Sequence, residues 1–316
     1  MKENEYFDNT LFMRLVCVLA AIALVCVMIF VIAGIVGGNS QSDIDENNDY
    51  EEWTFSTDTS TEAPTTTEAP ATTDTPATTD TSATTDTPAT TADPETTAEV
   101  VQTPLPDSPV ILTETDDMGQ SYIDSIVFLG DSTTYGMIPY AVLSEGKQTK
   151  QVWTPTSGTL TLDQAVKKKI YYPELDDEIT AAEAAAAKQP QYLIITLGVN
   201  GVSFMNEEQF VTEYVKLVQS IQTASPQTKI ILQSIFPVAA NYEKLEQINN
   251  EKISRANTWV LKVAETCGVK YLNTASMLHD EDGWLHTAFQ NGDGMHFNEV
   301  GFKTVLNYIR THGYID

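Results

Sequence analysis

The sequence predicts an α/β domain of three layers, in which about five parallel strands form a sheet between two layers of helices. Short apolar runs alternate about five times with longer amphipathic stretches after residue 121. The apolar runs are hydrophobic at successive positions, which is typical of strands buried on both faces of a parallel sheet. The first 120 residues have a different composition and are not expected to contribute to this core.

Five apolar runs are the predicted strands, and turn residues follow them. Gly130 follows the first run, Gly158 lies in the loop after the second, and Gly198 follows the third. The runs comprise residues 126–129, 151–153, 192–197, 229–235 and 269–272.

Four amphipathic stretches are the predicted helices, comprising residues 177–188, 206–223, 245–266 and 298–310. Asn206 and Gln209 have the spacing of a capping box, which marks the start of the second helix. Alternating strands and helices predict a doubly wound α/β/α sheet of the flavodoxin-like kind. In such sheets the ligand site lies beyond the carboxyl ends of the strands.

An uninterrupted apolar run, residues 15–36, is long enough to cross a bilayer as one helix. Lys2 and Arg14 precede it, and the first basic residue after it is Lys147. The positive-inside rule therefore predicts a single-pass cell-membrane protein with residues 1–14 in the cytoplasm and everything after Gly37 outside. A signal peptide cleaved near Gly38 is the alternative.

Residues 37–120 are predicted to be a disordered stalk, because Thr, Pro, Ala and Asp repeats such as ATTDTP supply little apolar surface. The folded domain is then expected to occupy residues 121–316. The chain has a net charge of −27. Most of this charge comes from residues 37–124, which hold 20 Asp or Glu and no Lys or Arg. A chain this acidic, without a basic patch, is not expected to bind nucleic acid.

The remaining composition excludes two kinds of stabilising group. Cys17 and Cys26 lie in the predicted span and Cys267 is the third cysteine, so the exported domain has no internal disulfide. Residues 279–283 (HDEDG) lack the full spacing of a calcium loop, and no metal or other cofactor is predicted. The sequence does not indicate an oligomeric state.

Five residues with the chemistry of acyl transfer lie where the fold would bring them to one sheet edge. Such a reaction requires a nucleophile, a base, a group that orients the base, and donors for the oxyanion. A serine after the first strand could be the nucleophile, and a histidine and an aspartate before the last helix could be the base and its orienting group. A side-chain amide and a loop glycine could be the oxyanion donors. They are Ser132, His296, Asp293, Asn200 and Gly158.

Each of these residues also has an ordinary structural interpretation. Ser132 could be a helix N-cap, and Asp293 could belong to a flexible glycine-rich turn. His296 could be a surface histidine, Asn200 a turn asparagine, and Gly158 an unremarkable loop glycine. Their order and their positions after successive strands favour the catalytic interpretation.

With these residues in place, the region 125–316 resembles the SGNH/GDSL hydrolase superfamily. The matching segments are Gly130-Asp131-Ser132, Gly158, Gly198-Val199-Asn200 and Asp293-Gly294-Met295-His296. The resemblance implies that Ser132 is the nucleophile, His296 the base and Asp293 its orienting group. It also implies an oxyanion hole formed by the N–H groups of Ser132 and Gly158 with the Asn200 side chain.

Two positions depart from the superfamily pattern. Gly201 follows Asn200 where an aspartate is usual, which removes a carboxylate that could brace the loop. Thr133 and Thr134 follow Ser132 in place of the common leucine. Neither departure alters the serine, histidine or aspartate.

The resemblance and the expected location together predict an extracellular serine esterase that removes acyl groups, foremost acetyl, from carbohydrate. The same apparatus could serve a lipase, lysophospholipase or thioesterase, or an acyltransferase in which a sugar hydroxyl replaces water. A different class of function is a stalked wall glycoprotein that binds carbohydrate without turnover. Loss of activity in Ser132→Ala would separate the enzymes from that binding protein.

Overall fold

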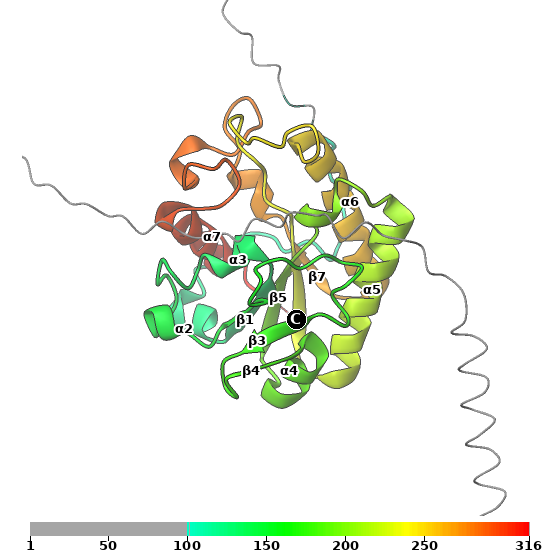
Figure 1. Ribbon diagram of the computed structural model, residues 1–316, viewed down its shortest axis with the longest axis vertical. Helices are drawn as coiled ribbons and strands as arrows, with labels where there is room; N and C mark the ends of the chain where they lie inside the picture. Colours follow the sequence, from blue (N-terminus) through cyan, green and yellow to red (C-terminus); the bar gives the residue numbers. More distant parts are fainter. Residues whose placement is uncertain (1–99, 101, 316) are drawn as a thin grey trace, which may run out of the picture. The chain divides into compact units, whose positions relative to one another are not determined.

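The computed structural model describes residue 100 and residues 102–315 (Figure 1). The predicted cytoplasmic segment, the span at 15–36 and the stalk up to residue 99 lie outside the described residues. Among the helices that are described, none has both the length and the hydropathy that crossing a bilayer requires.

A parallel sheet of five strands lies at the centre of the domain, as predicted. Its order is β2-β1-β5-β6-β7, and every neighbouring pair is parallel. The strands are β1 (Ile126–Gly130), β2 (Val152–Trp153), β5 (Tyr192–Thr196), β6 (Lys229–Gln233) and β7 (Lys270–Leu272).

Successive residues of each central strand point into two separate cores. Val127 and Leu129 pack in the core that includes residues of α4, α5 and α6, whereas Ile126 and Phe128 pack in the core that includes residues of α2 and α7. Figure 1 shows these two groups of helices on opposite sides of the strands. This arrangement confirms the predicted α/β class and explains why the strands are apolar at every position. The helices are α2 (Gly119–Asp124), α4 (Ala181–Lys188), α5 (Glu207–Ala224), α6 (Asn250–Cys267) and α7 (Glu299–Thr311).

The helices differ from the prediction at two starting points. The capping box of Asn206 and Gln209 is present and begins α5. In contrast, the predicted helix at 177–188 begins only at Ala181, because Asp177–Thr180 is strand β4, antiparallel to β3 (Lys169–Tyr172). The helix predicted from residue 245 begins at Asn250, where the side chain of Asn249 accepts a hydrogen bond from the N–H of Lys252.

The domain also begins earlier than the predicted boundary at residue 121. The N–H of Leu112 donates to the carbonyl of Tyr271 at 2.8 Å, and the N–H of Tyr271 donates to Val110 at 2.9 Å. Farther upstream, the N–H of Thr103 donates to Ser254 Oγ at 2.6 Å. Leu112 is buried in the core beside α7. Part of the predicted stalk therefore belongs to the folded domain, because the short apolar segment at 110–112 pairs with Tyr271 and buries Leu112.

Candidate active site

The loops after β1, β2 and β5 carry Ser132, Gly158 and Asn200, and the loop before α7 carries Asp293 and His296. Carboxyl ends of parallel strands share one edge of a sheet, so these loops converge. The structure places His296 in hydrogen-bond contact with both Ser132 and Asp293, although 164 positions separate the serine from the histidine.

Ser132 is the first residue of the short helix α3 (Ser132–Tyr135), and it is not the N-cap. That position belongs to Asp131, whose Oδ1 accepts hydrogen bonds from the N–H of Thr133 at 3.0 Å and from Thr133 Oγ1 at 2.7 Å. Because Asp131 caps the helix, the hydroxyl of Ser132 is available to His296, whose Nε2 lies 2.9 Å from Ser132 Oγ.

The imidazole of His296 is held on its other side by Asp293. The distance from His296 Nδ1 to Asp293 Oδ2 is 2.7 Å, and Asp293 Oδ1 accepts the N–H groups of Met295 and His296, each at 2.8 Å. A carboxylate at Nδ1 favours the tautomer that carries its proton there. Nε2 then presents a lone pair to Ser132 Oγ, which is the arrangement required to remove the serine proton.

The pairing of Asp293 with His296 predicts a pH-dependent contribution to stability. Burial opposes ionisation of Asp293, but hydrogen bonds from the side chain and backbone of His296 outweigh burial and lower the pKa of Asp293 to about 2, from 3.8. A lowered folded-state pKa stabilises the fold above the unfolded value, and this stabilisation is lost as the pH falls from about 4 towards about 2.

We therefore expect wild type to be more stable than Asp293→Asn at neutral pH, with the difference narrowing as the medium is acidified below about pH 4. Urea unfolding of both proteins, followed by circular dichroism across this pH range, measures the difference. A difference in unfolding free energy that stays constant with pH would contradict the assignment.

The predicted oxyanion donors are in place to different degrees. Gly158 adjoins the nucleophile, since a methyl group on it would stand 3.8 Å from Ser132 Cβ. Its N–H, however, donates to the carbonyl of Pro155 at 2.9 Å and closes a turn. Gly158 can give this hydrogen to an oxyanion only if the turn opens or the bond is shared. The N–H of Ser132 is the first of α3, and the first N–H of a helix has no acceptor within the helix.

Asn200 is linked to Asp131, a residue that the sequence analysis did not select. Asn200 Nδ2 donates to Asp131 Oδ2 at 3.0 Å and lies 3.5 Å from the carbonyl of Leu160. An amide nitrogen carries two hydrogens, so the bond to Asp131 fixes the direction of the second, which makes only a long hydrogen bond to Leu160 and is the one an oxyanion could take over. The Asp131 side chain is fully buried, and burial raises its pKa against the opposing hydrogen bonds from Thr133.

The segment after β6 forms another wall of the site and is clamped to α6 by two asparagine side chains. Asn257 accepts from the N–H of Ile235 at 2.7 Å and donates to its carbonyl at 3.1 Å. Asn250 does the same with Val238, at 2.7 and 2.8 Å. The N–H and carbonyl groups of Ile235 and Val238 therefore all have hydrogen-bond partners, which keeps this extended segment rigid.

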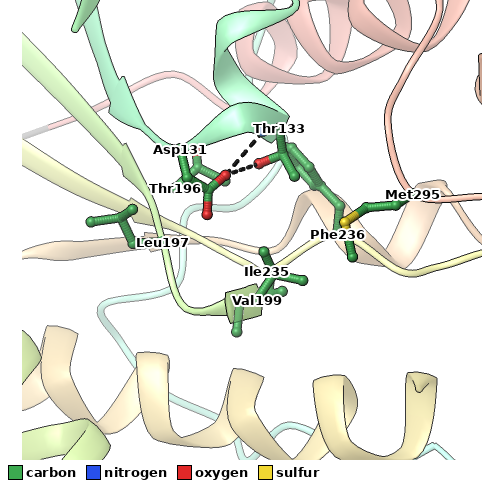
Figure 2. Close-up of a pocket in the computed structure, with 8 residues that line it drawn as sticks. All are labelled: Asp131, Thr133, Thr196, Leu197, Val199, Ile235, Phe236 and Met295. Carbon is green, nitrogen blue, oxygen red and sulfur yellow. Dashed lines mark hydrogen bonds between the residues drawn. The ribbon is translucent and has the colours of Figure 1, made fainter. Parts of the chain in front are cut away.

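A small pocket lies against this wall, and several residues that line it are adjacent in sequence to the candidate site residues (Figure 2). Asp131 and Thr133 flank Ser132, Val199 precedes Asn200, and Met295 precedes His296. The pocket is lined by Asp131, Thr133, Thr196, Leu197, Val199, Ile235, Phe236 and Met295. Within the described part of the chain, no group of acidic, histidine or cysteine side chains could hold a metal ion.

Comparison with known protein families identifies one whose model matches this chain. The model of the GDSL-like lipase/acylhydrolase family matches residues 128–303. A search of curated proteins found no match.

Several solved structures are similar at low identity. One is a protein from Streptococcus pneumonia described as a platelet activating factor, which is 19% identical to this chain. The alignment covers 59% of this chain and 82% of that chain, with a TM-score of 0.46. A GDSL-like lipase from Bacteroides thetaiotaomicron is 17% identical, with 60% and 87% covered and a TM-score of 0.42. A carbohydrate esterase family 3 protein from Talaromyces cellulolyticus is 14% identical, with 58% and 93% covered and a TM-score of 0.40.

The family match spans more than half of the chain, from the middle of β1 into α7, and includes every residue of the candidate site. The chain therefore belongs to the GDSL-like lipase/acylhydrolase family and is a hydrolase that acts on ester bonds.

Proposed function

We propose that the protein hydrolyses esters through an acyl-enzyme on Ser132, with His296 as general base and acid and Asp293 as the group that orients it. The observation that carries the proposal is the continuous chain from Ser132 Oγ to His296 Nε2 at 2.9 Å and from His296 Nδ1 to Asp293 at 2.7 Å. Each member has the role that its position in this chain allows.

In the first half-reaction, Ser132 Oγ attacks the ester carbonyl carbon while its proton moves to His296 Nε2. Asp293 stabilises the imidazolium that forms. The Ser132 N–H and the second Asn200 hydrogen donate to the oxyanion, and Gly158 joins them once its turn opens. Collapse of the tetrahedral intermediate breaks the bond to the alcohol oxygen, which takes the proton from His296 as it leaves.

In the second half-reaction, water takes the place of the alcohol. His296 removes a proton from the water, and the hydroxide attacks the acyl carbon. The bond to Ser132 Oγ then breaks, and Oγ recovers the proton from His296. The acid is released and the free enzyme is restored.

We propose further that the acyl group is short, foremost acetyl, and that it is carried by a carbohydrate outside the cell. Three of the residues that line the pocket beside the site are polar, namely Asp131, Thr133 and Thr196. The pocket has a volume of only about 10 Å³, which is close to the space of one small group and too little for a long alkyl chain. The extracellular location rests on the apolar run at 15–36 and the Thr/Pro-rich repeats after it.

The test is release of acetate from acetylated xylan, acetylated chitin fragments and peptidoglycan by the purified full-length protein, with Ser132→Ala as the control. We expect acetate release from at least one polymer and none with the variant. A panel of p-nitrophenyl esters from acetate to palmitate tests the acyl length, and we expect kcat/KM to fall as the chain lengthens. Rates that rise with chain length would instead assign a lipase or thioesterase.

A further inference from the structure

The loop that carries Asp293 has little side-chain packing of its own. Its ends are held by the bridge between Gln290 and Phe297, and the N–H of Asn291 donates to the carbonyl of His296 at 2.8 Å. Its centre is Gly292-Asp293-Gly294, in which both glycines have positive φ angles, 117° and 83°. Glycine has the least restricted backbone of all residues, so side-chain hydrogen bonds must hold Asp293 in register.

The side chain of Gln290 supplies this restraint. Its Oε1 accepts the N–H of Gly292 and the N–H of Gly294, each at 2.9 Å. These two peptide groups lie on either side of Asp293. One amide oxygen therefore fixes the backbone both before and after the carboxylate that contacts His296.

The Gln290 side chain is itself oriented by the loop that follows β6. Its Nε2 donates to Asn241 Oδ1 at 3.3 Å, and Asn241 Nδ2 donates to the carbonyl of Gly292 at 3.2 Å. The donors and acceptors of both amides are thus mutually consistent, and turning either amide over would break these bonds. Gln290 and Asn241 together form an amide clamp on the Asp293 loop.

The clamp is backed by a rigid support. The N–H of Ala239 donates to the carbonyl of Gly294 at 2.7 Å, and a methyl group on Gly294 would stand 2.7 Å from the backbone of Tyr242. Immediately upstream, Val238 is held on both its N–H and its carbonyl by Asn250 of α6. The Asp293 loop is therefore connected through residues 238–242 to a long helix, and not only to its own chain neighbours.

We propose that Gln290 is a positioning residue for the acid–base pair, with Asn241 as its brace. By holding Asp293, the clamp keeps His296 Nε2 directed at Ser132 Oγ. This inference rests on the proposed function of Ser132, His296 and Asp293. Gln290 lies three residues before the Asp-Gly-Met-His segment, so motif spacing alone does not reveal it.

The test compares Gln290→Ala and Gln290→Glu in the full-length protein, using p-nitrophenyl acetate. The alanine variant leaves both glycine N–H groups without their acceptor, and a misplacement of about 1 Å at a catalytic group can cost about 100-fold in rate. We expect kcat to fall at least about tenfold with little change in KM, because an interaction important to the transition state is weakened. Gln290→Glu keeps the acceptor oxygen for both glycine N–H groups but loses the bond to Asn241, so its kcat is expected to lie between those of Gln290→Ala and wild type.

The pH profile of kcat/KM distinguishes positioning from a general loss of structure. We expect Gln290→Ala to move the acidic limb of the profile, because the contact between the base and its carboxylate partner is loosened. Gln247→Ala is the matched control: this glutamine is exposed in the segment that leads to α6, and its change should leave rate and profile as in wild type. Asn241→Ala should reproduce the direction of the Gln290→Ala effect at smaller amplitude.

Each outcome decides between the hypotheses. If Ser132→Ala is inactive while Gln290→Ala retains the wild-type kcat and pH profile, the positioning role is wrong and the proposed function stands. If Ser132→Ala keeps full activity, the proposed function itself fails. Should Gln290→Ala not fold, Gln290→Glu still tests the role, since low kcat with the wild-type pH profile in that folded variant would overturn it.

Discussion

Replacing Ser132 with alanine is expected to lower kcat for ester hydrolysis by about 10⁴- to 10⁶-fold, the range found when a serine nucleophile is removed from such a site. The side chain loses only its hydroxyl, and that hydroxyl contacts His296 rather than capping α3, which Asp131 does. Thermal stability should therefore change little while the reaction is lost.

The measurement combines turnover of p-nitrophenyl acetate with labelling by a fluorophosphonate probe, and peptide mass spectrometry locates the adduct. Wild type should be labelled at Ser132, and the variant should not be labelled. Ser203→Ala, at an exposed serine close to Asn200 in the chain, is the matched control and should be labelled as wild type. Label on another residue would show that the activated nucleophile has been misassigned.

The second large effect is expected at Asp131, where asparagine should lower kcat by about 10²- to 10³-fold, the usual cost of one oxyanion donor. Both carboxyl oxygens of Asp131 accept hydrogen bonds, one from Thr133 and one from Asn200. An asparagine must place its NH₂ group at one of these positions. When it faces Asn200, that amide has to turn over and present its oxygen where a donor is needed.

A double variant separates the hydrogen bond from its catalytic consequence. In Asp131→Asn with Asn200→Asp, the NH₂ group of the new asparagine can donate to the new carboxylate, so the free energy of unfolding should recover towards the wild-type value. The rate should not recover, since no amide hydrogen remains at position 200 for the oxyanion. Asp163→Asn, at an exposed position, is the control for the change of charge. Recovery of both stability and rate would refute the positioning of Asn200 by Asp131.

The sequence was most informative where the pattern is local and repeated. Apolar runs located all five strands of the sheet, since a strand buried on both faces is apolar whichever way its residues point. The hairpin of β3 and β4 was not predicted, because Asp177–Thr180 is acidic and polar like the first turn of a helix. Only its antiparallel partner, which lies outside any local window, makes it a strand.

The candidate site likewise contains residues that the local sequence pattern predicts and residues that depend on distant contacts. Chain order and position after the strands were enough to select Ser132, Asp293 and His296, which the structure brings together. Asp131 has a signal in hindsight, since it directly precedes the serine and is placed to cap the helix that follows. Gln290 and Asn241 have none, because their contact spans 49 positions and depends on how two loops pack.

The segment that pairs with β7 protects the sheet from other chains. β7 is the last strand in the order of the sheet, and a last strand exposes unpaired N–H and carbonyl groups that another copy could extend. Residues 110–112 occupy these groups at Tyr271, while Asp117 forms an ion pair with Arg310 of α7. A chain that began at residue 121 would still contain every residue of the active site, but the edge of β7 would be unpaired. Removal of the earlier residues is therefore expected to cause aggregation rather than loss of activity.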